Sequence, residues 1–476
     1  MIYFDHVQFT YPNSDTASLS NLSLNVRKGE CIVVTGRSGC GKTTMTRLIN
    51  GLATHFYGGR LYGTLRLNGE LQARIPFWAI GRRAGSILQD PSSQFFAEKV
   101  RDELAFGCEN YGLPRNEMIK RIAAAAEKTG IDDLLDQSLF QLSSGLQQRV
   151  AIASIRAIDP DIYVFDEPSA NLDTGSIDRL AELMLELKRE GKTLFIAEHR
   201  LYYLRSLADR FLYMEDGQLI RQMSVSEISG FSQSDIRRLG LRSLRLPDIK
   251  YRLTPHKEKK SGHPALDIRD LNFSFKKTPV LSHINLTAGR GDIIAVTGPN
   301  GAGKTTLAKA ICGLIKEKAG TVLFDGHRER RRARKRKAFF VMQHPDSQLF
   351  SESVLDELNL NAANSRQAEE LLSAYHLLPF SKKHPSTLSG GQKQRLTLAV
   401  AEAVNPEILL LDEPTSGLDG QNMRLIAGRL RMMASSGKTI IVITHDLEFI
   451  SIACTRVIRL ENGKKVRDDE LSPPNL

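Results

Sequence analysis

The feature that most constrains this chain is an internal duplication, in which five short motifs occur twice and in the same order. A glycine-rich segment at residues 36–44 returns at 298–306, and a glutamine-containing segment at 88–96 returns at 342–350. The three later pairs are LSSGLQQR and LSGGQKQR, IYVFDEPSANLD and ILLLDEPTSGLD, and FIAEH and IVITH. Chance does not produce five motifs in matching order, so the chain carries two copies of one unit.

The spacing between the copies predicts where they differ and where they end. Corresponding residues are 262 apart in the glycine-rich motif, 254 apart in the glutamine motif and 246 apart in the last three. The first copy is therefore longer in two places, where we expect surface loops. We place the copies at 1–222 and 264–476. The intervening residues 223–263, rich in Ser, Arg and Lys, predict a linker with a short helix around Ser234–Gly240.

Apolar periodicity predicts the fold class. The short apolar runs at 31–34, 162–165 and 194–197 indicate buried parallel strands, and the amphipathic stretches at 119–128 and 176–189 indicate helices. Alternation of strands and helices predicts an α/β fold in which each copy has a mostly parallel sheet.

Composition excludes several classes of protein. Apolar residues make up 41% of the chain and charged residues 25%, which is typical of a globular protein. The longest apolar runs, such as 338–342, are far shorter than the roughly 20 residues of a membrane-spanning helix. The N-terminus does not resemble a signal peptide. The five cysteines are scattered, so we expect neither a disulfide framework nor a cysteine metal site, and a reducing cytoplasm fits.

The glycine-rich motif predicts a phosphate-binding loop in each copy, because it follows a predicted strand and precedes a predicted helix. Its glycines let successive backbone N–H groups point at phosphate oxygens, and the helix adds its positive N-terminal end. The lysine would reach the β- and γ-phosphates, and the next threonine would bind Mg²⁺. The loop residues assigned to the nucleotide are Gly36, Arg37, Ser38, Gly39, Cys40, Gly41, Lys42, Thr43 and Thr44, and Gly298, Pro299, Asn300, Gly301, Ala302, Gly303, Lys304, Thr305 and Thr306.

Two acidic residues end a later apolar strand in each copy, and this pattern suits metal-assisted phosphoryl transfer. Asp166 and Asp412 are the predicted Mg²⁺ ligands, with Thr43 and Thr305. The glutamates that follow them, Glu167 and Glu413, are predicted to orient or deprotonate the attacking water. His199 and His445, which close the next strand at the same offset, are predicted to contact the γ-phosphate.

The serine–glycine motif predicts a second anion site at the start of a helix. Its assigned residues are Ser143 and Gly145 in the first copy, and Ser389, Gly390, Gly391 and Gln392 in the second. One nucleotide does not need two such sites on one domain. We therefore expect a head-to-tail sandwich, in which Ser389 caps the ATP on Lys42 and Ser143 caps the ATP on Lys304.

These motifs resemble two fused ATP-binding cassettes of the ABC superfamily, and the resemblance covers nearly the whole chain. It implies ATP hydrolysis with ATP and Mg²⁺, a helical subdomain in each cassette, and six further assignments. Gln89 and Gln343 resemble the glutamines that link Mg²⁺ to that subdomain, and Tyr11 and Phe275 match the aromatic position that stacks on adenine. The aspartates Asp173 and Asp419 resemble those that cross the dimer interface.

A narrower pattern follows each glutamine. The pattern P-x-x-Q-x-F…V-x-x-E begins at Pro91 and again at Pro345, and is similar to the ATPases of energy-coupling-factor (ECF) importers of vitamins, their precursors, cobalt or nickel. The resemblance implies a peripheral protein on the cytoplasmic face of the cell membrane. Its partners would be other chains, a transmembrane coupling protein and a substrate-binding membrane component.

The first copy departs from the family motif, with Ser144 for the middle glycine and Leu146 for the glutamine. Under head-to-tail pairing the altered motif faces the nucleotide on Lys304. We therefore expect an asymmetric pair, with Glu167 and His199 in the more active site.

The segment 328–337 carries a net +7 of the chain's +11. Our first interpretation is a solvated loop, our second a contact with anionic headgroups or acidic partner loops, and our third nucleic acid. The alternative function is a twin-cassette ATPase acting on ribosomes or nucleic acid. Such proteins commonly carry a long charged helical linker, a cysteine cluster or zinc modules, which this sequence does not show, so we do not expect a nucleic-acid partner.

Overall fold

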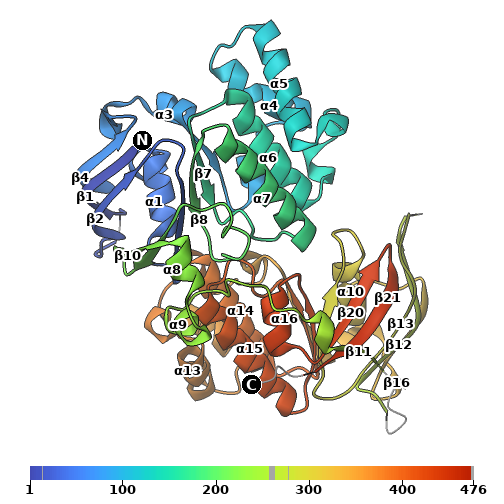
Figure 1. Ribbon diagram of the computed structural model, residues 1–476. Helices are drawn as coiled ribbons and strands as arrows, with labels where there is room; N and C mark the ends of the chain where they lie inside the picture. Colours follow the sequence, from blue (N-terminus) through green and yellow to red (C-terminus); the bar gives the residue numbers. More distant parts are fainter. Residues whose placement is uncertain (13, 257–262, 277, 473–476) are drawn as a thin grey trace. The chain divides into compact units, whose positions relative to one another are not determined.

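A computed structural model describes residues 1–12, 14–256, 263–276 and 278–472. The chain divides into two compact units (Figure 1). The first is built on Met1–Arg245 and the second on Leu246–Leu418 and Asn422–Leu476. Each unit is described by itself below.

The first unit is organised around a six-stranded sheet of order β10-β9-β3-β8-β7-β6, in which only β10 runs antiparallel to its neighbour. Its strands are β3 (Cys31–Gly36), β6 (Ala84–Ile87), β7 (Ile162–Asp166), β8 (Thr193–Ala197), β9 (Arg210–Glu215) and β10 (Gln218–Ser224). Every residue of β3 and β8 is buried, which explains their continuous apolar sequence. The predicted parallel α/β core is confirmed.

A second, antiparallel sheet of order β2-β1-β4-β5 packs its alternating apolar residues on one face. Its strands are β1 (Ile2–Thr10), β2 (Leu19–Val26), β4 (Arg60–Leu67) and β5 (Glu70–Leu71). That face shares a core with the central sheet and with helix α1 (Lys42–Ile49). Two short helices, α2 (Leu52–His55) and α3 (Phe77–Arg83), lie between the strands in sequence.

Three helices of the first unit gather into a lobe with a core of its own (Figure 1). They are α4 (Val100–Asn110), α5 (Arg115–Thr129) and α6 (Ser144–Ile158). Helix α6 presents Val150 and Ala153 to the lobe, and Ala151 and Ile152 to the core of the central sheet. Helix α7 (Thr174–Arg189) packs its apolar face on the same sheet core.

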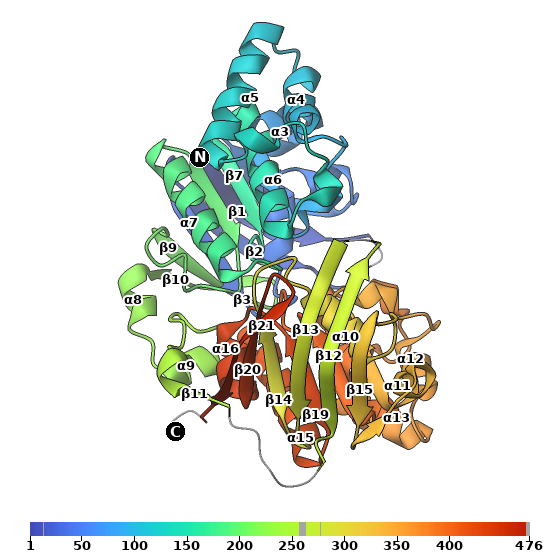
Figure 2. The ribbon, with the colours of Figure 1, turned by 90° about the vertical axis from the view of Figure 1, so that its right-hand side faces the viewer.

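The second unit repeats this plan, as the duplication predicts (Figure 2). Its central sheet has the order β11-β21-β20-β14-β19-β18-β17, and its antiparallel sheet has the order β13-β12-β15-β16. The strands are β11 (Leu253–Pro255), β12 (Leu266–Phe275), β13 (Thr278–Ala288), β14 (Ile293–Thr297), β15 (Ala319–Phe324), β16 (His327–Arg328), β17 (Ala338–Val341), β18 (Ile408–Asp412), β19 (Thr439–Ile443), β20 (Arg456–Glu461) and β21 (Lys464–Leu471). The helices are α10 (Lys304–Ile311), α11 (Arg331–Lys337), α12 (Val354–Asn359), α13 (Ser365–Ala374), α14 (Gly390–Val404), α15 (Gly420–Ser435) and α16 (Leu447–Ala453).

The extra residues between the glutamine and the serine–glycine motif of the first copy are not a surface loop, as we had expected. They lengthen two helices: α4 and α5 have 11 and 15 residues, whereas α12 and α13 have 6 and 10. A helix pair tolerates added turns at its outer end as readily as a loop tolerates added residues, so spacing alone did not separate the two cases.

Much of the predicted linker packs on the first unit. Residues 223–245 include helices α8 (Val225–Ser229) and α9 (Gln233–Arg238), and the latter lies close to the helix expected at 234–240. Ile228 and Ile236 are buried in the core of the first central sheet. The part of the linker at 257–262 lies outside the described residues.

The basic segment, which we first interpreted as a solvated loop, is mainly the helix α11. Arg334 is its fully buried residue, donating to the Ala310 carbonyl (2.9 Å) and pairing with Glu317 (2.8 Å). Burial of Arg334 on one side, with Arg332, Lys335 and Arg336 exposed on the other, is typical of an amphipathic helix, and a local charge count does not reveal it.

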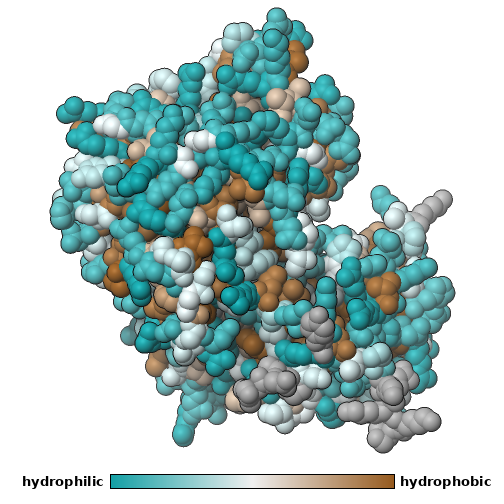
Figure 3. All heavy atoms as spheres, viewed as in Figure 1, coloured by the Kyte–Doolittle hydropathy of each residue, from teal (hydrophilic) through white to brown (hydrophobic). Residues whose placement is uncertain are grey.

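The face of the molecule drawn in Figure 3 is largely hydrophilic, with apolar residues in small separate groups. Across the described residues, no helix combines the length and the hydropathy that crossing a bilayer requires.

Candidate active site

The first glycine-rich loop connects β3 to α1, and its geometry requires glycine. Gly36 has φ of 147°, and a Cβ there would lie 2.2 Å from the Met214 carbonyl oxygen. The Nζ of Lys42 donates to the carbonyls of Gly36 (3.2 Å) and Arg37 (3.1 Å). The loop therefore curls around the lysine head group.

The second loop, between β14 and α10, has the same geometry. Gly298 has φ of 131°, and a Cβ there would lie 2.0 Å from the Leu460 carbonyl oxygen. Lys304 donates to the carbonyls of Gly298 (2.6 Å) and Pro299 (3.0 Å). In both units the assigned loop residues form one continuous cradle at the N-terminal end of a helix.

The predicted Mg²⁺ ligands contact each other in both units. Thr43 Oγ1 donates to Asp166 Oδ1 (3.1 Å), and Thr305 Oγ1 donates to Asp412 Oδ2 (2.8 Å). Burial, with a contribution from Glu167, raises the pKa of Asp166 to about 7, and burial raises that of Asp412. The oxygen donors fit Mg²⁺, which usually takes one or two carboxylates together with substrate phosphates and water.

The glutamate of the first unit lies among the other predicted catalytic residues. Glu167 Oε2 accepts from Gln89 Nε2 (3.1 Å), and its Oε1 is 3.4 Å from His199 Nε2. Burial works to raise the pKa of Glu167, but His199 and Lys42 outweigh it and hold that pKa below its usual range. The backbone of Glu167 has φ of 47°, a left-handed conformation that costs energy in a non-glycine residue.

The second unit differs around its glutamate. Glu413 also has φ of 47°, but its Oε1 lies 3.9 Å from His445 Nε2, and its Oε2 accepts from Thr444 Oγ1 (3.1 Å). Gln343, the counterpart of Gln89, follows the end of β17. The glutamate–histidine pairs of the two units thus occupy equivalent positions but differ in their distances and in the hydrogen-bond partners of the glutamate.

Sequence reasoning missed Glu198, which orders the histidine of the first unit. Its carboxylate accepts from the backbone N–H groups of Ser169 (3.2 Å) and His199 (2.6 Å) and from the Tyr203 hydroxyl (2.8 Å). The sequence signal that could have identified it is the acidic residue in the motif FIAEH. The second copy lacks it, and there Asp446 accepts from Thr415 Oγ1 (2.8 Å).

The assigned serines cap the two long helices of their own units. Ser143 begins α6 and accepts from Leu146 N–H (3.4 Å). Ser389 begins α14 in a reciprocal capping box with Gln392, which Leu146 cannot reproduce. Within the described residues, no hydrogen bond joins either serine to the glycine-rich loop of its own unit. Their assignment as separate anion sites stays a prediction.

Gly145 and Gly390–Gly391 complete these two helix starts. At Gly145 a Cβ would lie 2.4 Å from Ser176 Oγ, so glycine is needed there for close packing against the start of α7.

The two predicted adenine-stacking residues have unequal surroundings. Tyr11 meets the rings of Phe9 and Tyr57 edge-on, with centroids 4.9 and 5.8 Å away. Arg47 lies over Tyr57 at 4.5 Å and donates to the Tyr11 hydroxyl (3.5 Å). By contrast, Phe275 is 59% exposed and contacts Phe273 edge-on. Tyr57 and Arg47 were not predicted, because no motif includes them.

Comparison with known proteins identifies the family. The model of the family described as ABC transporter matches residues 19–170 and 281–416. An ABC transporter ATP-binding protein of Treponema denticola is 40% identical over 98% of this chain and 97% of its own length. One from Methanosarcina acetivorans is 31% identical over 97% of this chain and 84% of its own length.

Among solved structures, a model of ribosome-bound archaeal Pelota and ABCE1 has a TM-score of 0.68, with 22% identity over 98% of this chain and 78% of that one. At that identity the likeness concerns the fold alone. The family match and the curated relatives, together with the paired loops and acids above, lead to one conclusion. This chain belongs to the ABC transporter family and is an ATPase with two ATP-binding cassettes in one polypeptide.

Proposed function

We propose that this chain is the energy-coupling ATPase of an ECF-type membrane importer for a vitamin, a vitamin precursor or a transition-metal ion. It would bind the cytoplasmic face of the membrane peripherally, through a transmembrane coupling protein that also carries a substrate-binding membrane component. The curated relatives, described as ABC transporter ATP-binding proteins, support a role in transport.

The observation that carries this proposal is a loop after each glutamine in which the same glutamine and glutamate hydrogen bonds recur in both units. In the first unit, Gln94 Oε1 accepts from the backbone N–H of Leu88 (3.0 Å). The buried carboxylate of Glu103 accepts from the N–H groups of Phe96 and Ala97, both at 2.9 Å. The glutamine and glutamate of the pattern P-x-x-Q-x-F…V-x-x-E thus fix the backbone on both sides of the phenylalanine.

In the second unit, Gln348 Oε1 accepts from Met342 N–H (2.7 Å). The buried Glu357 accepts from the N–H groups of Phe350 and Ser351, both at 2.8 Å. Since the two copies differ at most other positions, this shared construction supports a shared task.

In each unit this loop exposes one large apolar side chain to solvent. Phe96 is 75% exposed and Phe350 is 80% exposed. A phenylalanine fixed in this way suits a protein partner, because ordering it beforehand reduces the entropy that binding must supply. Each lies seven residues after the glutamine of its catalytic site, Gln89 or Gln343. A partner bound there would therefore act on the segment that carries that glutamine.

The mechanism that fits these groups is ATP-driven closure of the two cassettes, head to tail. Lys42 and Lys304 would bind the phosphates, and Mg²⁺, which reduces their negative charge, would be held by the Thr–Asp pairs of each unit. Glu167 and Glu413 would orient and deprotonate the attacking water. The reopening that follows hydrolysis would be passed to the membrane partner.

The proposal is tested by replacing the exposed phenylalanines. The double variant Phe96→Ala, Phe350→Ala should bind its membrane partners on the order of 30-fold more weakly or worse, since an interface anchor is worth about 2 kcal/mol or more. Co-purification from detergent-solubilised membranes measures this, followed by solute uptake. The ATPase rate of the isolated chain should be unchanged, because neither ring contacts the catalytic groups.

The control is Tyr62→Ala, which removes another solvent-exposed ring, 58% exposed, from β4. Equal recovery of membrane proteins with the double variant and with the control would contradict the proposal. So would purification of the native chain on ribosomes, or salt-sensitive DNA binding, either of which would favour the twin-cassette alternative.

A second prediction tests the head-to-tail pairing. In a Glu167→Gln background, where hydrolysis depends on Glu413, the changes Ser144→Gly and Leu146→Gln restore the family motif in the first unit. We expect them to raise the residual ATPase rate about 10-fold, the lower end of what one hydrogen bond to a charged group contributes, about 1.5–3 kcal/mol. Restoring the motif in a Glu413→Gln background should have no such effect. An increase in both backgrounds, or in neither, would contradict the pairing.

A further inference from the structure

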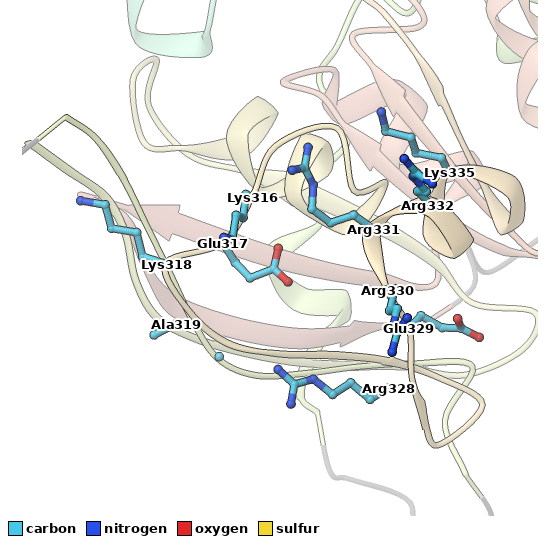
Figure 4. Close-up of a pocket in the computed structure, with 11 residues that line it drawn as sticks. Lys316, Glu317, Lys318, Ala319, Arg328, Glu329, Arg330, Arg331, Arg332 and Lys335 are labelled. Carbon is cyan, nitrogen blue, oxygen red and sulfur yellow. The ribbon is translucent and has the colours of Figure 1, made fainter.

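The second unit contains a strongly basic groove outside the nucleotide site. The groove has a volume of about 1130 Å³ and is lined by residues 316–320, after α10, and by 328–332 and Lys335, around α11 (Figure 4). Seven of its eleven lining residues are Lys or Arg. This groove, which we call the basic groove, accounts for much of the chain's excess positive charge.

The acids of the basic groove are already neutralised by bases that do not line it. Glu317 pairs with the buried Arg334, and Glu329 pairs with Lys337 (both 2.8 Å). Within the described part of the chain, none of the seven lining bases forms an ion pair. The groove therefore presents uncompensated positive charge to solvent.

The fold does not require this charge. In the first unit the helix at the same place, immediately before the strand that leads to the glutamine, is α3, with the sequence FWAIGRR. There Phe77 and Trp78 are 44% and 67% exposed. In α11, Arg334 is buried, Arg331 donates to the Gly313 and Leu314 carbonyls, and Lys337 pairs with Glu329. The exposed bases Arg332, Lys335 and Arg336 make no such contact in the described part of the chain and are available for binding.

We infer that the basic groove binds the phosphate headgroups of anionic phospholipids at the membrane surface. The positive charge and the volume suit phosphodiester headgroups, and long Lys and Arg side chains reach an anionic surface while their stems stay on the protein. Leu314, 38% exposed, borders the groove, since its carbonyl accepts from Arg331 (3.2 Å). This inference rests on the proposed function, which puts the chain at a membrane.

Lipid fits the groove better than nucleic acid. Proteins that bind single strands interleave basic residues with aromatic side chains on which bases stack. No aromatic residue lines the groove. Binding to a lipid surface requires only positive charge, because its phosphates carry no bases and have no fixed spacing along a strand.

The test uses the full chain and protein-free vesicles. Flotation with equimolar phosphatidylcholine and phosphatidylglycerol should recover the protein, and vesicles of phosphatidylcholine alone should not. The triple variant Arg328→Gln, Arg332→Gln, Lys335→Gln should bind the anionic vesicles on the order of 100-fold more weakly, since each base near such a surface contributes about fivefold. All three side chains are exposed and make no hydrogen bond in the described structure, so the fold should be retained.

The control variant Lys382→Gln, Arg431→Gln, Lys464→Gln removes the same charge from exposed positions of the same unit away from the groove. Its binding should match the native chain, and both variants should keep the native ATPase rate. Equal losses in the two variants, equal binding to both vesicle types, or tighter binding of a short RNA or DNA through the same three bases would overturn the inference. Because no membrane protein is present, failure here leaves the importer proposal standing.

Discussion

Replacing Glu167 by Gln is expected to lower the ATPase rate of the whole chain more than replacing Glu413 by Gln. Loss of a general base typically costs about 10²–10⁴-fold at the affected site. Glu167 lies 3.4 Å from His199 and accepts from Gln89, and under head-to-tail pairing its nucleotide faces the intact serine–glycine motif. Steady-state phosphate release from the purified chain measures the difference.

The Glu413→Gln variant is the matched control, because it removes the same group from the equivalent strand end. Both variants should still bind ATP, since neither glutamate belongs to the glycine-rich loop. Equal losses of rate would count against the asymmetry. A larger loss for Glu413→Gln would reverse it, assigning the more active site to the second unit's loop.

The second large effect is expected at the two loop lysines. Lys42→Ala and Lys304→Ala should each weaken ATP binding at its own site about 10–100-fold, because charge-assisted hydrogen bonds to phosphate are worth about 1.5–3 kcal/mol. In both units the lysine head is held by two carbonyls of its own loop, in position for a phosphate. Titration with a fluorescent ATP analogue, at two-site stoichiometry, measures the change.

Lys28→Ala and Lys382→Ala, which remove exposed lysines from each unit, are the controls and should bind ATP as the native chain does. The double variant Lys42→Ala, Lys304→Ala should lose saturable binding at concentrations that fill both native sites. Undiminished binding in either single variant would contradict the assignment of that lysine to the phosphates.

The parallel sheets were predictable because their strands are buried on both faces and read as continuous apolar runs. The strand-end acids were predictable as a group for a related reason. Parallel strands such as β7 and β8 bring their carboxyl ends to one edge, so Glu167 and His199 meet although they are 32 residues apart. Their catalytic roles remain predictions.

Other features depend on contacts that no local pattern reveals. The charged sequence of α11 did not predict a helix. The burial of Arg334 depends on its ion pair with Glu317, a residue that lies in an earlier turn. The support that Glu198 gives to His199 depends on Ser169 and Tyr203, from segments without periodic signal. The packing of residues 223–245 on the first core likewise rests on isolated apolar residues, such as Ile236, within a polar stretch.

The separate core of the α4–α6 lobe has a mechanical consequence. In the first unit the apolar cluster of the lobe is distinct from that of the central sheet; α6 contributes buried residues to both, and Phe95 packs against both. In the second unit, residues such as Leu358 and Leu372 belong to the same cluster as Leu409 and Val442 of the sheet. The first cassette can therefore tilt its lobe about α6 as a stiff lever, whereas the second must shear a continuous interior to do the same. The two cassettes share one plan but differ in how much apolar packing must be disturbed when the helical lobe moves.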